Sequence, residues 1–379
     1  MISTQGPGPE ITAERARSLA LEAQFAPGER AGAAEVFHRL GVLQLDPLRR
    51  VDRAHRLTLL SRLPSSAGIH TVDSALWPGP AVTFELLNGV ACVYPLAHWP
   101  LFAPIRARLA ARPNAPEAAE AAEILALVAE HPAGVTIGVL EHEGRRTAGW
   151  EWSRRKWVAE FLVRTGALVV THRIEGQRVF DLPERRIPAE LLHAELSPEA
   201  TLASLGGLGI ASLGIATARD LARHYGLSRV EAVRALELSA AVPVRVAGWA
   251  DPAWVSPAAA ERLAAPAAAL PSRLIGPFDS LLRDRDRARR VFSFDYLFEA
   301  YKPAETRVYG HYVLGVLHGG RFVGRVDAQR TGGELLLRGE FPEAGIPARS
   351  FAAGVDRASR TLARQLRVAP ARGPASPAA

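Results

Sequence analysis

The sequence is short of cysteine, of lysine and of long apolar runs, and these shortages exclude whole classes of protein. Cys92 is the only cysteine in 379 residues, which excludes an internal disulfide framework and a zinc site with two or more thiolates, and favours a reducing compartment. No run of about 18 uncharged apolar residues occurs, and the first 25 residues carry acidic side chains without an unbroken apolar stretch. We therefore expect no membrane span and no export signal, and a cytoplasmic location.

Arginine is abundant. The formal net charge is +7, and all but two of the 46 basic residues, Lys156 and Lys302, are arginine. The planar guanidinium binds phosphate oxygens in pairs and stacks on bases, which suits a nucleic-acid partner. A GC-rich genome would also enrich arginine, together with alanine, glycine and proline. Composition alone therefore leaves both explanations open.

The fold class predicted from the pattern is α+β. With 48% apolar and 22% charged residues the chain is globular, and at about 150 residues per domain its length suggests two or three structural units. Two helices followed by a short β-hairpin recur three times, the pattern of a winged helix-turn-helix. In the first copy we expect helices over Ile11 to Phe25 and Ala31 to Leu40, ended by Gly41, and then an extended, arginine-rich stretch over 42–63.

The second and third copies follow a Pro- and Ala-rich linker at 111–118. The second has helical spacing over Glu117 to Glu130, Val135 to His142 and Glu151 to Thr165, followed by a hairpin at 167–183. In the third, Thr217 and Ser228 are expected N-caps, and a hairpin follows at 242–255.

From Leu274 onward the pattern is strand-like, including 290–303, and predicts a C-terminal antiparallel sheet. Gly319-Gly320 and Gly332-Gly333 are expected at hairpin turns, Ala352 to Leu366 as a closing helix, and the last residues as a disordered tail. The predicted domains are 1–110 with the first winged helix, 111–200 with the second, 201–273 with the third, 274–368 as the β-rich part and 369–379 as the tail.

One short motif, Gln44-Leu45-Asp46-Pro47, could carry chemistry. Gln44 and Asp46 are two positions apart, so on an extended backbone both side chains project from one face, while Leu43 and Leu45 pack on the other. Pro47 keeps the preceding residue out of the helical region and so fixes the aim of the carboxylate. An amide beside a carboxylate can hold one water. By itself, however, the motif is more often a turn that Asp46 caps.

The residues around this motif resemble those of a known protein family. Residues 40–63, LGVLQLDPLRRVDRAHRLTLLSRL, closely resemble the signature of the AlkZ/YcaQ family of winged-helix DNA glycosylases. Three further stretches resemble the family in the same order: 149–188, 213–227 and 276–328. The resemblance covers nearly the whole chain from about Ile11 to Phe341.

The resemblance implies three tandem winged helices and a β-rich part in a C shape around a duplex-DNA channel. It implies a monofunctional hydrolase of the N-glycosidic bond of N7-alkylguanine, which in some members unhooks guanine interstrand cross-links and in some protects producers of DNA-alkylating natural products. Gln44 and Asp46 become the catalytic pair of the Gln-x-Asp branch. The protein would then be a nucleoid-associated monomer whose partner is double-stranded DNA with alkylated or cross-linked guanine.

Basic residues after the motif and in the run at 283–290 are the candidate DNA contacts. They are Arg49, Arg50, Arg53, His55, Arg56, Arg62, Arg283 and Arg287. His55 could equally be a structural histidine, and the 283–290 run, which alternates in sign, could be only a solvated face. Of the tryptophans, Trp150, Trp152 and Trp157 have helical spacing and are expected in the core.

One departure from the family pattern concerns Phe84-Glu85-Leu86-Leu87-Asn88-Gly89. Relatives usually carry Trp and His where this chain has Leu87 and Gly89, whereas Phe84, Glu85, Ala91 and Pro95 match. The change could widen the lesion cleft for a bulky adduct, or weaken activity on the usual substrate.

No metal site and no cofactor are expected. The histidines do not pair with carboxylates at helical spacing, and no glycine-rich phosphate loop follows a strand. The main alternative to a glycosylase is a non-catalytic winged-helix DNA-binding regulator. A metal-dependent nuclease is a third possibility, but the chain shows no carboxylate cluster for it.

Overall fold

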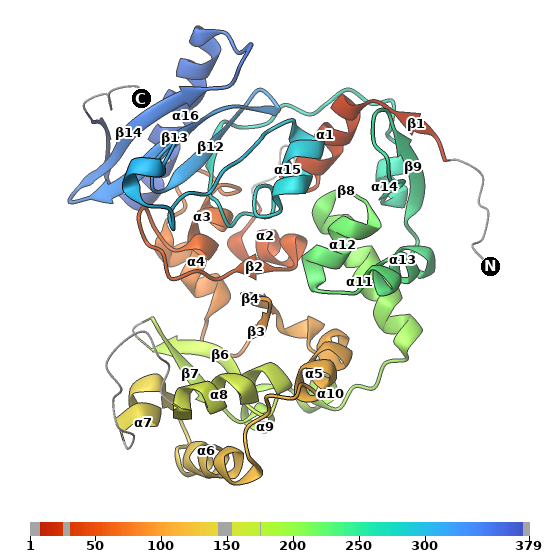
Figure 1. The fold of residues 1–379 in the computed structure, drawn as a ribbon, viewed down its shortest axis with the longest axis vertical. Helices are drawn as coiled ribbons and strands as arrows, with labels where there is room; N and C mark the ends of the chain where they lie inside the picture. The colour runs from red at the N-terminus through yellow and green to blue at the C-terminus, as the bar shows by residue number, and fades with distance from the viewer. Residues whose placement is uncertain (1–7, 26–30, 143–153, 175, 374–379) are drawn as a thin grey trace. The chain divides into compact units, whose positions relative to one another are not determined.

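The computed structural model describes residues 8–25, 31–142, 154–174 and 176–373 (Figure 1). Its contacts divide the chain into two compact units, one made of Met1–Val72 with Leu202–Ala379 and one made of Asp73–Thr201. This division is coarser than the domains expected from the sequence. The count of three winged helices and the finer boundaries stay predictions.

The N-terminal part of the first unit is mainly helical. Its elements are β1 (Glu10–Ile11), α1 (Ala13–Glu22), α2 (Ala33–Leu40), β2 (Leu43–Gln44), α3 (Ala54–Leu60) and α4 (Ile69–Leu76), the last of which runs into the second unit. Gly41 ends α2 at φ 69°, a left-handed conformation that glycine adopts without steric cost. The extended stretch predicted over 42–63 is wrong at α3, because buried Ala54, Leu57 and Thr58 follow helical spacing.

The second unit contains helices and two hairpins. Its elements are β3 (Thr83–Asn88), β4 (Val90–Pro95), η1 (Leu96–His98), η2 (Pro100–Phe102), α5 (Ala103–Ala110), α6 (Ala118–Glu130), β5 (Val135–Thr136), α7 (Ile137–His142), α8 (Arg154–Thr165), β6 (Val169–Ile174), β7 (Gln177–Asp181), α9 (Pro183–Arg186) and α10 (Ala189–Leu192). The expected helices and the second hairpin are present, except that the expected helix over 135–142 begins with the short strand β5. Trp157 packs against the core of this unit, whereas Trp150 and Trp152 lie outside the described residues.

The chain then returns to the first unit through α11 (Pro198–Leu213). The elements that follow are β8 (Ile215–Ala216), α12 (Ala218–Tyr225), α13 (Arg229–Leu238), β9 (Val242–Val246), β10 (Ala253–Val255) and α14 (Pro257–Ala260). The two expected N-caps, Thr217 and Ser228, each form a capping box. The strands form a sheet in the order β1-β9-β10-β8, in which the N-terminal strand runs parallel to β9.

A five-stranded sheet closes the first unit. It has the order β11-β12-β13-β14-β15, with β11 (Arg273–Ile275), β12 (Val313–His318), β13 (Arg321–Thr331), β14 (Glu334–Pro342) and β15 (Ala369–Arg372). The long helix α16 (Ala348–Leu366) packs on this sheet (Figure 1). Both predicted glycine pairs lie between strands. The tail prediction is wrong for 369–372, because these residues pair in parallel with β14; residues 374–379 lie outside the described residues.

The strand predicted over 290–303 is also wrong. The helix α15 (Arg285–Phe292) covers its start, and η3 (Ala304–Thr306) is the only regular element in the loop that follows. Phe294 and Tyr296 are buried and Asp295 is exposed, so the alternation of apolar and polar residues correctly indicates an extended backbone here. Among the described strands none pairs with this segment, and the carbonyls of Asp295 and Glu299 accept side-chain donors instead, from Arg325 at 2.9 Å and from Arg307 at 3.2 Å.

Candidate functional site

The motif at 44–46 lies where β2 leaves the helical part of the first unit. Leu43 is fully buried, whereas Gln44, Leu45 and Asp46 are half-buried, so the expected apolar face is carried mainly by Leu43. The Oδ1 atom of Asp46 accepts the backbone N–H of Leu48 at 2.9 Å. This bond spans Pro47 and leaves the second carboxylate oxygen, Oδ2, for another donor.

Burial raises the pKa of Asp46, and the hydrogen bond from Leu48 opposes that rise. A carboxylate with a raised pKa is a stronger proton acceptor than one in water. The site therefore favours the role of a base that acts on a nearby water.

Two tyrosines that follow α15 are electrostatic neighbours of Asp46. Burial and the charge of Asp46 together raise the pKa of Tyr301, and the same charge adds to the burial that raises the pKa of Tyr312. Tyr312 is fully buried and, within the described residues, its hydroxyl has no hydrogen-bond partner, whereas Tyr301 is 75% exposed. The sequence analysis missed both, because their loop carries no motif that pairs it with residue 46.

Asp52, which the sequence analysis also missed, pairs with several basic residues around the motif. Its carboxylate accepts Arg56 Nη1 at 3.0 Å and Arg330 Nη1 at 3.2 Å, and the backbone N–H of Arg53 at 2.7 Å. The backbone N–H of Arg330 also donates to the carbonyl of Arg50 at 2.9 Å, so β13 is tied to the segment that follows the motif. Part of the charge expected to face phosphate is therefore compensated inside the protein.

The candidate DNA contacts divide by burial. Arg49 is exposed, while Arg50, Arg53 and Arg56 are half-buried. His55 is 2% exposed inside α3, which cannot place its ring against a phosphate in this conformation. The DNA contact of His55 stays a prediction, and the burial favours its alternative, a structural histidine.

Arg62 is likewise a structural residue. Its side chain is 1% exposed, and it forms a two-pronged ion pair with Asp279, with Nη2 to Oδ1 at 2.8 Å, and bonds to Gln24 as well. The pair joins the end of α3 to the loop after β11. The phosphate contact of Arg62 stays a prediction, and the internal partners of its guanidinium favour a structural role.

The two predicted DNA contacts in the 283–290 run, Arg283 and Arg287, also donate to groups inside the fold. Arg287 is 2% exposed and donates to the carbonyls of Ile215 at 2.8 Å and Leu213 at 2.9 Å, besides pairing with Asp220. Its DNA contact stays a prediction, and its internal partners favour a structural role, as for Arg62. Arg283 is half-buried and donates to the ring nitrogen and the carbonyl of His224, both at 3.2 Å.

The departure from the family pattern lies in the hairpin of β3 and β4. Asn88 pairs with Val90 around Gly89, whose φ of 79° is left-handed. A histidine at this turn would be strained, so this backbone explains the glycine. Glu85, which keeps the family residue, is buried and pairs with Arg173 and Arg178 of the hairpin β6–β7.

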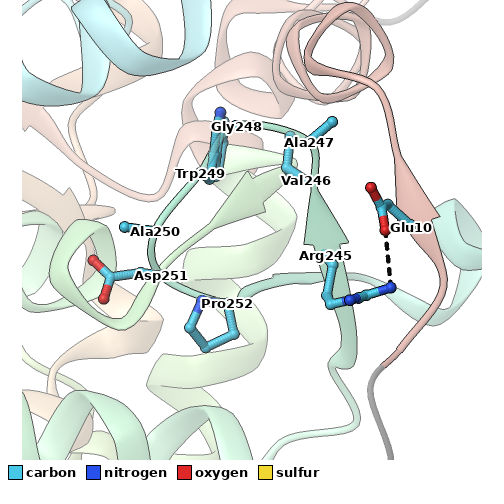
Figure 2. A pocket seen from close by; sticks show the side chains of 9 residues that line it. All are labelled: Glu10, Arg245, Val246, Ala247, Gly248, Trp249, Ala250, Asp251 and Pro252. Carbon is cyan, nitrogen blue, oxygen red and sulfur yellow. Dashed lines mark hydrogen bonds and ion pairs between the residues drawn. The ribbon is translucent and has the colours of Figure 1, made fainter.

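A surface hollow of ≈ 360 Å³ lies elsewhere in the first unit, beside β1 and β9. It is lined by Glu10 and by 245–252, and the exposed ion pair of Glu10 and Arg245 lies at its edge (Figure 2). None of its lining residues is a predicted site residue. Over the described part of the chain no group of three or more His, Cys, Asp or Glu side chains could hold a metal ion, and no helix is long and apolar enough to span a membrane.

Comparisons with known proteins bear on the whole chain. Residues 37–365 match the family "DNA glycosylase AlkZ-like". The fold is similar to that of the DNA glycosylase AlkZ of Streptomyces sahachiroi, with a TM-score of 0.66 and 18% sequence identity over 96% of this chain and 99% of that one. The matched span includes Gln44 and Asp46 and reaches almost to the end of α16. The chain belongs to the AlkZ-like DNA glycosylase family.

Proposed function

We propose that this DNA glycosylase hydrolyses the N-glycosidic bond of N7-alkylguanine in duplex DNA, with Gln44 and Asp46 as its catalytic pair. The observation that supports the proposal is the half-buried Asp46 carboxylate, which is oriented by Pro47 and by the hydrogen bond from Leu48 and has a raised pKa. The activity is monofunctional, since the motif offers no amine to attack the sugar.

The substrate itself lowers the demand on the enzyme. A guanine alkylated at N7 carries a positive charge, so it leaves as a neutral base and needs no general acid. An ordinary glycosidase uses two carboxylates, one of which is that acid. One carboxylate is therefore sufficient to stabilise the oxocarbenium-like sugar and to take a proton from the attacking water. The amide of Gln44 orients the water.

The raised pKa of Asp46 is compatible with the role of a base as long as the carboxylate is ionised at neutral pH. The carboxylate must be ionised to act, and at neutral pH an aspartate whose usual pKa is ~3.9 remains ionised unless the shift is very large. Partial burial lets the charge act through a medium less polar than water, which strengthens its effect on a cationic transition state.

The decisive measurement is release of N7-methylguanine from duplex DNA. We expect Asp46→Asn and Gln44→Ala to lower the single-turnover rate by about 10²-fold or more, as loss of a general base or of a positioning group does. Asp251→Asn, a change of the same chemistry at a side chain that is 46% exposed, is the control and should release base at the wild-type rate. Undiminished release by both catalytic variants would remove the pair from the mechanism.

A companion substrate series defines the lesion. Duplexes with a bulky natural-product adduct and with an N7–N7 guanine cross-link test whether the enzyme also unhooks cross-links and serves self-resistance, as some relatives do. A regulator, the alternative, would instead bind one operator sequence tightly and release no base from any of these duplexes.

A further inference from the structure

The long helix α16 has two opposite faces. Its buried face packs on the five-stranded sheet through residues such as Phe351, Val355 and Leu362. The opposite side is basic and exposed, and its residues are Arg349, Arg357, Arg360 and Arg364, here called the arginine face. At 3.6 residues per turn these four side chains lie within an arc of about 80°, centred opposite the buried face.

The charge of the arginine face is poorly compensated. Over residues 344–373 the only acidic side chain is Asp356. Its carboxylate accepts Arg372 Nη2 at 2.8 Å, and Arg360 Nη2 lies 3.7 Å from its other oxygen. One carboxylate is therefore shared between two guanidinium groups, and one of these lies outside the face.

The other three arginines of the face have no carboxylate partner among the described residues. Exposed arginines elsewhere in the same unit differ. Arg229 is paired with Asp251, and Arg245 with Glu10. A helix face that is only solvated usually carries charges of both signs. The arginine face instead presents one sign over four turns of helix.

The helix that carries this face is fixed to the rest of its unit. The buried amide of Gln365 donates to the carbonyls of Leu60 at 2.8 Å and Pro64 at 3.1 Å, at the end of α3. Arg330 Nη2 donates to the carbonyl of Leu366 at 3.3 Å. Since these bonds form on the buried side of α16, the arginine face points away from α3. It is thus a surface separate from the basic residues on α3.

The chemistry of the face fits a phosphate backbone. From Arg349 to Arg364 the helix extends by about 22 Å, which corresponds to about six nucleotides of one DNA strand. Guanidinium groups bind phosphate oxygens in pairs. None of the large apolar side chains that are exposed in the described part of the chain lies on α16. The face therefore lacks the apolar anchors of a protein interface or of a membrane-bound helix.

We propose that the arginine face of α16 is a second DNA-binding surface, which contacts the phosphate backbone of a duplex segment other than the one that holds the lesion. A glycosylase must find rare damage in undamaged DNA, and a contact that reads only phosphate keeps it on any sequence. The inference goes beyond the proposed function, and it does not depend on which base the enzyme releases.

The test measures binding to a long undamaged duplex over a series of salt concentrations. We expect the double variant Arg357→Gln with Arg364→Gln to lower the slope of log affinity against log salt by about two, because each phosphate contact contributes about 0.9. Arg357→Lys with Arg364→Lys keeps both charges and should keep the slope. Base release by the Gln variant under single-turnover conditions at saturating enzyme should equal that of the wild type.

The matched control is Arg229→Gln with Arg245→Gln. It removes the same charge from arginines that are 69% and 58% exposed but already paired with carboxylates. We expect its salt slope to stay close to that of the wild type. Urea unfolding of both double variants shows that a change in slope comes from the folded protein.

Three results would overturn the inference. An unchanged slope in the Gln variant of the arginine face would make that face a solvated surface, and binding to anionic phospholipid vesicles that this variant loses would then assign it to a membrane. An equal fall in the control would assign the effect to net charge. Slower base release at saturating enzyme would place the face in the catalytic site. Failure of the proposed function is distinguishable, because the salt slope is measured on DNA without a lesion.

Discussion

At the scale of residues, the arginines divide into two classes that the sequence does not separate. Arg49 is exposed, whereas Arg62 and Arg287 are buried in ion pairs with Asp279 and Asp220. Each buried guanidinium also bonds to oxygen atoms of the fold, which compensates the cost of removing its charge from water. A count of basic residues therefore overstates the number that can contact phosphate.

The two classes should respond in opposite ways to alanine. Arg49→Ala is expected to lower the slope of log affinity against log salt by about one and to leave the free energy of unfolding within about 0.5 kcal/mol. Arg62→Ala is expected to lower the free energy of unfolding by about 3–5 kcal/mol, because Asp279 is left buried without its partner. Salt titration of DNA binding and urea unfolding measure the two effects. A reduced salt slope without loss of stability in Arg62→Ala would reverse this assignment.

Asp46, the proposed catalytic carboxylate, should lower the stability of the folded protein at neutral pH. Its pKa is higher in the folded protein than in the unfolded chain, so folding disfavours the ionised form. The cost is fully present above the folded pKa and disappears below the unfolded pKa of ~3.9. Asp46→Asn, whose side-chain oxygen can keep the bond to Leu48, should raise the melting temperature at pH 7 and give no gain near pH 3. A lower melting temperature of the Asp46→Asn variant at pH 7 would contradict the raised pKa of Asp46.

At the scale of elements, the sequence predicted helix starts, helix ends and turns correctly where the local backbone conformation determines them. The N-caps Thr217 and Ser228, the end of α2 at Gly41 and the glycine pairs between strands all follow from conformations or hydrogen bonds within a few residues. Alternation failed between α15 and β12, because a period of two describes an extended chain but does not supply a partner strand.

The hairpin of β3 and β4 offers a test of such a local signal. Gly89→Ala should lower the free energy of unfolding by about 1 kcal/mol, because φ of 79° is unfavourable for a residue with a Cβ atom. Gly79→Ala is the matched control, since Gly79 has no positive φ and a Cβ there would meet no atom within 4 Å. Urea unfolding that gives equal losses for the two variants would show that the turn is not strained.

At the scale of the whole molecule, the proposed reaction asks little of the protein beyond binding and one carboxylate. On the proposed N7-alkylguanine substrate the leaving group departs neutral, because that lesion already carries a positive charge, so no Lewis acid is required to activate it. We expect base release from an N7-methylguanine duplex to be the same with and without EDTA. Strand cleavage that EDTA abolishes would instead point to the nuclease alternative.

The sequence by itself determined the family, the α+β class and the catalytic candidates, because these depend on a contiguous motif and on four stretches in a fixed order. Only the tertiary structure decided which arginines are paired with buried carboxylates, and that the charge of Asp46 acts on the pKa of Tyr301 and of Tyr312. More than 250 residues of chain separate these tyrosines from the motif. Packing brings both tyrosines within electrostatic reach of Asp46, and no local periodicity records an interaction across that distance along the chain.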